Sequence, residues 1–268
     1  MEKLDGVANT LYVPLYGRIY VSKKFPEYFY DEMALKIEEK FTSGISKGSF
    51  EYTNMAYAAR YYNMDKMIIK FIEEHKISNI VLLGIGLETA YDRITQKCGL
   101  GEVNYYGIDL PEVIEIRKKY FGERKQETLI AGDMFEMEWK KQIDTSIPAL
   151  LIVSGVFQYF FEDKIIEFIK NLKKEFPYGE LIFDTTTKNG LKFTNWFIKK
   201  TGNPEALMHF YIEDSVNFSK KTDTILVEEL IFFKDARELL RKKLNFITKL
   251  FMKIADSKRQ TLIIHLKW

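Results

Sequence analysis

Residues 79–94, NIVLLGIGLETAYDRI, begin with an apolar run, pass through Gly84 and Gly86, and then take up a helical pattern. In an open α/β sheet, the turn from the first strand to the next helix is where a nucleotide cofactor comes closest to the backbone. Glycines remove side chains from that turn, and the helix that follows presents free N–H groups to the ligand. The third glycine of the dinucleotide fingerprint is absent, because that position is Thr89. The stretch predicts a buried strand, a tight turn and a helix; a tight turn without a ligand is the alternative interpretation.

Strand-like and helical runs alternate from this stretch onward. The strand-like runs are IVLLG, VNYYGIDL, ETLIAGD, ALLIVSG and GELIFDTTT. They are apolar throughout, as strands covered on both faces must be. This order predicts a parallel sheet with helices on both faces. Near the end of the chain, ILVEELIFF and TLIIHLKW flank a helix expected to reach about Leu250, and a terminal antiparallel strand inserted into the sheet fits this ending.

One elaborated domain is expected over residues 1–268, because no low-complexity linker and no internal repeat divides the chain. Its expected parts are an N-terminal helical cap (1–76), a cofactor-binding core (77–187), a polar substrate-side insertion (188–224) and a C-terminal strand–helix–strand unit (225–268).

Composition limits the partners. Lys and Arg total 40 against 38 Asp and Glu, so the formal net charge is only +2 and nucleic acid is not an expected partner. Basic runs such as residues 241–243 are interpreted as solvated helix faces. The single cysteine, Cys98, cannot form an internal disulfide, which fits a reducing compartment. No apolar run approaches the roughly 18 residues that span a bilayer. We therefore expect a cytoplasmic protein with no membrane partner; the oligomeric state is left open.

Two carboxylates follow successive strands. Asp109 ends the second strand, 23 positions after Gly86, where an acceptor for ribose hydroxyls is expected. Asp133 follows the third strand and is expected at the same edge of the sheet. Alternatively, Asp109 caps the helix that starts at Pro111, and Asp133 lies in an ordinary turn. Their joint placement favours an adenosine site.

The runs VLLGIGLETAYDRI, YYGIDLPEVIEIRKKYF, AGDMFEMEW and LLIVSGVFQYF together resemble the leucine carboxyl methyltransferase and polyketide-synthesis O-methyltransferase family. The N-terminal segment TLYVPLYGRIYVSKKFPEYFYDEMAL and the final TLIIHLKW extend the resemblance over most of the chain. It implies the class I methyltransferase fold, with seven strands and the last antiparallel. It also implies S-adenosylmethionine as the cofactor and S-adenosylhomocysteine as the product.

The resemblance also implies roles for individual residues. Arg60 matches the arginine that holds the cofactor carboxylate, and Gly84 matches the motif glycine. Asp109 matches the acid that binds the ribose, while Asp133 and Met134 match the pair that flanks the adenine. A guanidinium suits a carboxylate, because two parallel charge-assisted hydrogen bonds fix its orientation. From the residues alone, Arg60 is expected to be an arginine on the exposed surface of a helix.

Three positions depart from the family pattern. The usual GLDTR is GLETA here, with Glu88 for the aspartate and Ala90 for the arginine. The usual EGVLMYL is SGVFQYF, so Ser154 replaces the glutamate that would receive the cofactor's ammonium. A serine hydroxyl accepts a hydrogen bond but carries no charge, so cofactor binding is expected to persist with a weaker contact.

The implied reaction is direct in-line methyl transfer to an oxygen of a small, largely apolar acceptor. No base is needed if the acceptor is already an anion, whereas a neutral hydroxyl needs one. Of the three histidines, His209 is the only candidate base, and the histidines show no metal-ligand spacing. Aromatic side chains in the N-terminal segment and after the fifth strand are candidates for the acceptor pocket: Tyr12, Tyr16, Tyr20, Phe25, Tyr28, Phe29, Tyr30, Phe193, Trp196, Phe197, Phe210 and Tyr211.

Three alternatives remain open at this point. One is a carboxyl methyltransferase that acts on a protein or peptide C-terminus. Another is a non-catalytic cofactor-binding protein on the same fold, which the departures at Ser154 and Ala90 would allow. The last is a nicotinamide-dependent oxidoreductase, which would share the two glycines and Asp109.

Overall fold

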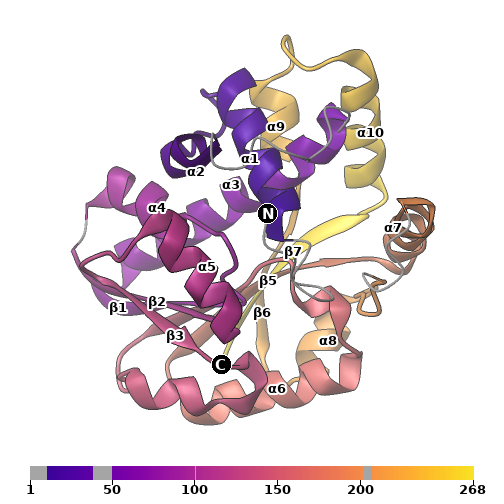
Figure 1. Ribbon diagram of the computed structural model, residues 1–268. Coiled ribbons are helices and arrows are strands. Elements are labelled where there is room, and N and C mark those ends of the chain that lie inside the picture. Colours follow the sequence, from indigo (N-terminus) through magenta and orange to yellow (C-terminus); the bar gives the residue numbers. More distant parts are fainter. Residues whose placement is uncertain (1–10, 39–49, 100, 202–206) are drawn as a thin grey trace.

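The computed structural model describes residues 11–38, 50–99, 101–201 and 207–268, and Figure 1 labels its elements. The strands are β1 (Ile77–Leu83), β2 (Glu102–Asp109), β3 (Glu127–Ala131), β4 (Ala149–Val153), β5 (Gly179–Thr186), β6 (Ile225–Ile231) and β7 (Thr261–Lys267). The α-helices are α1 (Tyr12–Lys24), α2 (Glu32–Ile37), α3 (Glu51–Glu74), α4 (Ala90–Cys98), α5 (Pro111–Phe121), α6 (Glu162–Glu175), α7 (Lys188–Thr201), α8 (Ser215–Lys221), α9 (Lys234–Leu239) and α10 (Phe246–Ser257).

The strands form one sheet in the order β3-β2-β1-β4-β5-β7-β6. β1 pairs in parallel with β2 and β4, and the parallel pairing continues to β3 and β5. β7 lies between β5 and β6 and is antiparallel to both. The expected seven-stranded sheet with an antiparallel last strand is confirmed. The sheet also differs from the strand order 3-2-1-4-5-6 of dinucleotide-binding folds, which disfavours the oxidoreductase alternative.

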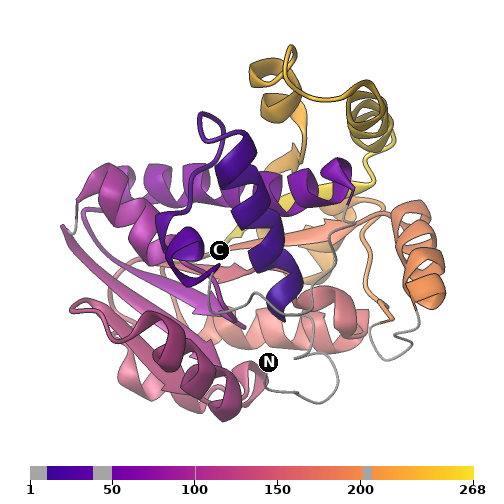
Figure 2. The same cartoon turned by 45° about the horizontal axis from the view of Figure 1, so that its top comes forward.

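Successive residues of the central strands point to opposite faces, so the sheet separates two apolar cores. Ile80 and Leu82 belong to the core beneath α3, whereas Val81 and Leu83 belong to the core over α6. Figure 2 shows α3 (purple) on one side of the sheet and α6 (pink) on the other. This explains why the strand runs are apolar at every position.

The N-terminal helices lie over the carboxyl edge of the sheet and on α3. Gly17 allows α1 to approach α3 closely, because a Cβ at this position would lie 2.8 Å from the Cβ of Tyr57. α2 begins at Asp31, whose side chain accepts a hydrogen bond from the N–H of Ala34 at 2.9 Å. The segment is therefore anchored by packing at α1 and by a cap at α2.

The C-terminal third departs from expectation in two places. The polar stretch after residue 203 contains α8, which Asp214 caps by accepting from the N–H of Asn217. The helix expected to end near Leu250 is in fact two helices. Asn245 interrupts it and caps α10 by accepting from the N–H of Thr248 at 2.8 Å, and α10 continues to Ser257. Both expectations followed the overall pattern of a long segment. Each missed a polar residue, Asp214 or Asn245, that caps a helix inside that segment.

Within the ranges that the structure describes, no helix is both long and apolar enough to cross a membrane.

Candidate functional site

The glycine turn after β1 has the backbone conformation that its sequence predicts. Gly84 and Gly86 have φ angles of +70° and +51°, in the left-handed region that favours glycine. A Cβ on Gly84 would lie 2.6 Å from a methyl group of Val156. The turn therefore requires glycine here both for its conformation and for its packing against the loop after β4.

Asp109 connects this turn to the end of β2. Its Oδ2 accepts from the N–H of Gly86 at 2.7 Å, and its Oδ1 accepts from the N–H of Leu110 at 2.8 Å. Burial raises the pKa of Asp109, and the two backbone hydrogen bonds oppose that rise. Asp109 does not cap the helix at Pro111, since no side chain caps α5.

A cavity of about 330 Å³ opens beside this turn, at the carboxyl ends of the strands. This volume is in the range of small-molecule sites. The predicted residues on its wall are Arg60, Gly84, Asp109, Asp133, Met134 and Ser154. The remaining wall consists of Leu11, Pro14, Arg18, Tyr61, Leu87, Leu110, Val113, Gly132, Phe135, Gly155, Val156, Tyr159 and Phe160. Gly86 is in the same turn but supports the wall through Asp109 without lining it.

Arg60 is buried, although its place on a helix allowed a surface arginine. One terminal nitrogen donates to Oδ2 of Asp184 at 3.2 Å, and the other donates to the hydroxyl of Tyr61 at 3.3 Å. Its Nε has no hydrogen-bond partner among the described residues. Burial opposes the charge, but Asp184 and Tyr61 outweigh it and raise the pKa of Arg60. A permanently charged guanidinium therefore forms part of the cavity wall.

Asp184 organises both Arg60 and the loop after β4. Its Oδ1 accepts from the N–H of Gly155 at 2.6 Å while its Oδ2 accepts from Arg60. Gly155 has a φ of +74°, and a Cβ there would lie 2.8 Å from a terminal nitrogen of Arg60. The sequence reasoning missed Asp184. The pattern that located Asp109 also applies to Asp184, because each is a carboxylate near the carboxyl end of a predicted strand.

Ser154 and Glu88 share a second, smaller space. Both line a void of about 20 Å³ beneath the glycine turn, together with Gly84 and Tyr61. Within the described residues, Oγ of Ser154 and Oε2 of Glu88 are buried without a hydrogen-bond partner. An unpaired buried polar atom is costly unless a ligand or water completes it. Two unpaired acceptors therefore adjoin the same void: Ser154 at the position of the family glutamate, and Glu88 at the position of the family aspartate.

Asp133 and Met134 occupy the loop after β3. Asp133 is exposed and caps a short 3₁₀ helix by accepting from the N–H of Phe135 at 2.9 Å. Met134 is buried, and its carbonyl accepts from the indole N–H of Trp139 at 2.9 Å. Asp133 therefore has the turn role of the alternative interpretation while also lining the cavity.

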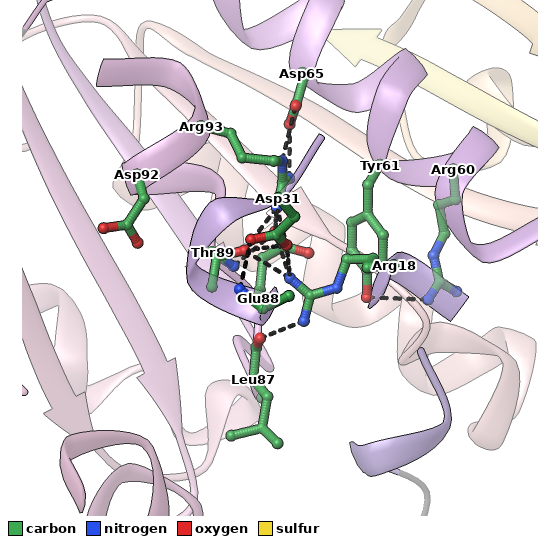
Figure 3. Close-up of polar contacts among 12 residues, drawn as sticks. Arg18, Asp31, Arg60, Tyr61, Asp65, Leu87, Glu88, Thr89, Asp92 and Arg93 are labelled. Carbon is green, nitrogen blue, oxygen red and sulfur yellow. Dashed lines mark hydrogen bonds and ion pairs between the residues drawn. The ribbon is translucent and has the colours of Figure 1, made fainter. Parts of the chain in front are cut away.

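Arg18 reaches the cavity wall from α1 and anchors it (Figure 3). One terminal nitrogen donates to Asp31 at 2.7 Å and to the hydroxyl of Thr89 at 2.6 Å, and the other donates to the carbonyl of Leu87. Its guanidinium carbon lies 5.0 Å from the ring centre of Tyr61, and that of Arg60 lies at the same distance. Tyr61 therefore separates two cations, as Figure 3 shows.

Arg93 completes this buried cluster from α4. It donates to both oxygens of Asp65 at 2.9 and 2.8 Å and lies 2.6 Å from Glu88. Burial favours the neutral acid at Glu88, but the charges of Arg93 and Arg18 hold the pKa of Glu88 below its ordinary value. We call Arg18, Asp31, Asp65, Glu88 and Arg93 the inner ion cluster. It joins α1, α2, α3 and the glycine turn.

Another buried arginine fixes the glycine turn from α5. Arg117 donates to the carbonyls of Gly86 and Glu88 and forms an ion pair with Glu127 at 2.7 Å. Apart from Glu88, which departs from the family pattern, the sequence indicated no role for Arg117 or for the residues of the inner ion cluster. Their partners are far apart in the sequence, so no local pattern indicated them.

The structure places His209 and the predicted acceptor aromatics away from this wall. The His209 ring lies against Phe161 at 4.5 Å, and His209 is not a lining residue. None of the predicted aromatics with a described side chain lines the cavity either; the side chain of Phe197 lies outside the description. Tyr12, Phe25, Tyr28, Phe29 and Phe210 are in the cores, and Phe193 and Trp196 are exposed. The aromatic wall instead consists of Tyr61, Phe135, Tyr159 and Phe160.

The described residues contain no group of three or more His, Cys, Asp or Glu side chains arranged to hold a metal ion.

The family model for leucine carboxyl methyltransferases matches residues 16–173, which include the inner ion cluster and most of the cavity wall. The chain belongs to the leucine carboxyl methyltransferase family. The resemblance inferred from the sequence is thus confirmed, and the predicted residues on the cavity wall all lie within the matched range.

One relative and two solved structures are similar to this chain. The tetracenomycin polyketide synthesis O-methyltransferase TcmP of Streptomyces glaucescens is 23% identical over 206 residues, covering 75% of this chain and 74% of that protein. A DUF574 family protein from Streptomyces avermitilis has a TM-score of 0.59 at 12% identity, over 94% of this chain and 96% of its own. A putative methyltransferase from Thermobifida fusca has a TM-score of 0.57 at 14% identity, over 94% and 93%. At these identities, the two structures show the fold alone.

Proposed function

We propose that this methyltransferase uses S-adenosylmethionine to methylate an oxygen of a small, largely apolar acceptor by direct in-line transfer. The observation that carries the proposal is a cavity whose wall holds both Asp109 and Arg60. These are the two groups that the family pattern assigns to the ribose and to the carboxylate of the cofactor.

The residues present fit this cofactor. The Asp109 carboxylate accepts one N–H on each oxygen and retains lone pairs for ribose hydroxyls. Arg60 lines the cavity and offers its positive charge to a carboxylate. The unpaired Ser154 hydroxyl is an acceptor for an ammonium. Met134, with Asp133 beside it, supplies an apolar surface for the adenine.

When bound, S-adenosylmethionine supplies a methyl group on a positively charged sulfur. The protein's own contribution is to hold the reactants in line and to exclude water. Leu110, Val113, Val156 and Phe160 give the cavity apolar walls. Such positioning can account for much of the rate enhancement, since well-oriented reactants reach effective molarities of about 10⁵ M or more.

The cavity wall favours an acceptor that ionises without help. No histidine is among the residues that line it, and its one buried carboxylate, Asp109, is bound to two backbone N–H groups. A carboxylate or an acidic phenol needs no base, whereas an alcohol would need one. His209 is therefore a base only if its segment moves toward the cavity.

Relatives support two acceptor classes. The family description names leucine carboxyl groups, and the relative from Streptomyces glaucescens acts in polyketide synthesis by its name. We favour the small-molecule class, because the described wall combines leucine, valine and phenylalanine with few charges.

A methyl-transfer screen tests this choice. The protein is incubated with S-adenosylmethionine carrying a radiolabelled methyl group, and with phenols, small carboxylic acids or peptides ending in leucine. We expect label in the phenols or acids, and none in an Arg60→Ala control. Label in the peptides alone would restore the protein carboxyl methyltransferase. Cofactor binding with no turnover across the screen would favour a non-catalytic binding protein.

A further inference from the structure

Helix α10 has two apolar faces. One packs in the core, and the other is exposed apart from a contact between the rings of Phe251 and Tyr52, whose centres lie 5.7 Å apart. The inner face places Met252 and Ala255 in the core with Leu240 and Leu244. The outer face consists of Phe246, Ile247, Leu250 and Phe251, which are 77, 61, 47 and 47% exposed. Residues at i, i+1, i+4 and i+5 lie on one side of a helix, so these four side chains form one stripe.

The stripe lies on a projecting part of the molecule. Figure 1 shows α9 and α10 beyond the end of the sheet, away from α4, α5 and α6, and Figure 2 shows the same projection from another side. Leu239, 59% exposed, adds a further apolar side chain at the end of α9. Large exposed apolar side chains that adjoin one another mark a contact surface more often than isolated ones do.

The segment that carries the stripe is basic, and the acids Glu238 and Asp256 flank it. Residues 239–255 contain Arg241, Lys242, Lys243, Lys249 and Lys253, and no acidic residue. Lys243 forms an ion pair with Glu27 at 2.6 Å. Arg241, Lys242 and Lys253 have no carboxylate within ion-pair distance in the ranges that the structure describes. Residues 239–255 therefore carry five positive charges and no negative one, whereas the whole chain has a net charge of only +2.

We propose that the outer face of α10 docks on an anionic lipid surface. A helix with an exposed apolar stripe flanked by lysines lies in the plane of a bilayer interface, with its apolar side chains among the acyl chains and its ammonium groups at the phosphates. A second copy of this chain fits less well, because a two-fold contact through this face would bring the same cations together. The proposal departs from the sequence expectation of no membrane partner. A surface helix needs no membrane-spanning segment, so the finding that no helix among the described residues can span a membrane does not conflict with it.

Vesicle flotation tests the proposal. The purified full chain is mixed with vesicles of phosphatidylcholine alone, or of phosphatidylcholine with phosphatidylglycerol, at low and high salt. We expect it to float with the phosphatidylglycerol vesicles and to be released by salt. The variant Phe246→Ser/Ile247→Ser removes the two most exposed apolar side chains, and Lys242→Glu/Lys253→Glu reverses two unpaired charges. Each should reduce the bound fraction by about tenfold.

Matched controls lie elsewhere on the surface. Val216→Ser/Ile225→Ser removes two similarly exposed apolar side chains, and Lys170→Glu/Lys220→Glu reverses two exposed charges on α6 and α8. Both should bind vesicles as the wild type does. The α10 variants should also bind cofactor normally, because none of these residues lines the cavity. Equal flotation of the α10 variants and the wild type would overturn the proposal. So would an absence of flotation, or a dimer in sedimentation that Phe246→Ser/Ile247→Ser dissociates.

Discussion

The two polar regions beside the glycine turn differ in how many ion pairs hold their charged groups. In the inner ion cluster, Arg18 contacts Asp31, and Arg93 contacts both oxygens of Asp65. On the cavity wall, by contrast, the Nε of Arg60 and the hydroxyl of Ser154 lack partners among the described residues. In the described ranges, Nε of Arg18 and Oε2 of Glu88 in the inner ion cluster also lack hydrogen-bond partners, so the difference lies in the ion pairs. Arg18 pairs with two acids and Arg93 with three, whereas Arg60 pairs with Asp184 alone among the described residues.

The difference indicates that the inner ion cluster and the cavity wall have different roles. A buried ion pair whose partners are all present holds segments together, and removing one partner leaves an uncompensated charge. Buried polar atoms without partners cost stability, and a ligand that completes their hydrogen bonds recovers that cost. We therefore expect mutations in the inner ion cluster to lower stability, and mutations on the cavity wall to lower affinity.

The largest effect should come from Asp31→Ala. Asp31 accepts from Arg18 and Thr89 and caps α2, so its loss leaves Arg18 buried without its closest carboxylate. The free energy of unfolding should fall by about 3 kcal/mol or more. Urea denaturation measures it, with Asp235→Ala as the control. Asp235 pairs with the exposed Lys66, so that change should cost less than about 1 kcal/mol. Similar losses in the two variants would mean that the inner ion cluster contributes no more to stability than an exposed ion pair does.

The contribution of Asp31 should also depend on pH. Burial alone would raise the pKa of Asp31, but the charges of Arg18 and Arg93 and the Thr89 hydroxyl lower it below its ordinary value. An acid with a lowered folded-state pKa stabilises the protein above its unfolded pKa of about 3.9, and that stability is lost as pH falls through the folded value. The stability difference between wild type and Asp31→Asn should be full near neutral pH and shrink below about pH 4. A difference that stays constant down to acid unfolding would contradict this assignment.

On the cavity wall, Arg60→Ala should weaken binding of S-adenosylmethionine by about 1.5–3 kcal/mol, the scale for a hydrogen bond to a charged group. Calorimetry measures the affinity. Arg124→Ala is the matched control, because Arg124 is also a largely buried arginine paired with carboxylates, Asp92 and Glu127, but does not line the cavity. Its affinity should be unchanged. If Arg124→Ala weakened binding as much, the loss at Arg60 would reflect the fold rather than contact with the cofactor.

A smaller effect is expected from Ser154→Glu, which restores the acid of the family pattern. Affinity should rise by about 1 kcal/mol, roughly fivefold, if the ammonium otherwise meets only a hydroxyl. Ser154→Ala serves as the comparison without charge. Unchanged or weaker affinity in a folded Ser154→Glu protein would mean that Glu88, whose Oε2 is unpaired in the adjoining void, already holds the ammonium. Glu88→Gln should then produce the larger loss.

The contrast also explains which residues the sequence could predict. Asp109 follows a strand at a fixed distance from the glycine turn, so a local rule locates it. Arg60 is buried beside Asp184, which is 124 residues away in the sequence. Only the family resemblance indicated that Arg60 belongs to the site. The inner ion cluster joins α1 to α4 through side chains with no local signature. α8 was missed because its seven residues lie in a polar stretch and depend on the cap at Asp214.

The central claim is that the cavity binds S-adenosylmethionine through Asp109 and Arg60. Calorimetric titration of the wild type and Asp109→Asn, with S-adenosylmethionine and with NAD as separate ligands, tests it most directly. We predict one S-adenosylmethionine per chain, no heat of binding with NAD, and an affinity about tenfold or more lower in Asp109→Asn. Wild-type affinity in a folded Asp109→Asn protein, or binding of NAD in place of S-adenosylmethionine, would contradict the account.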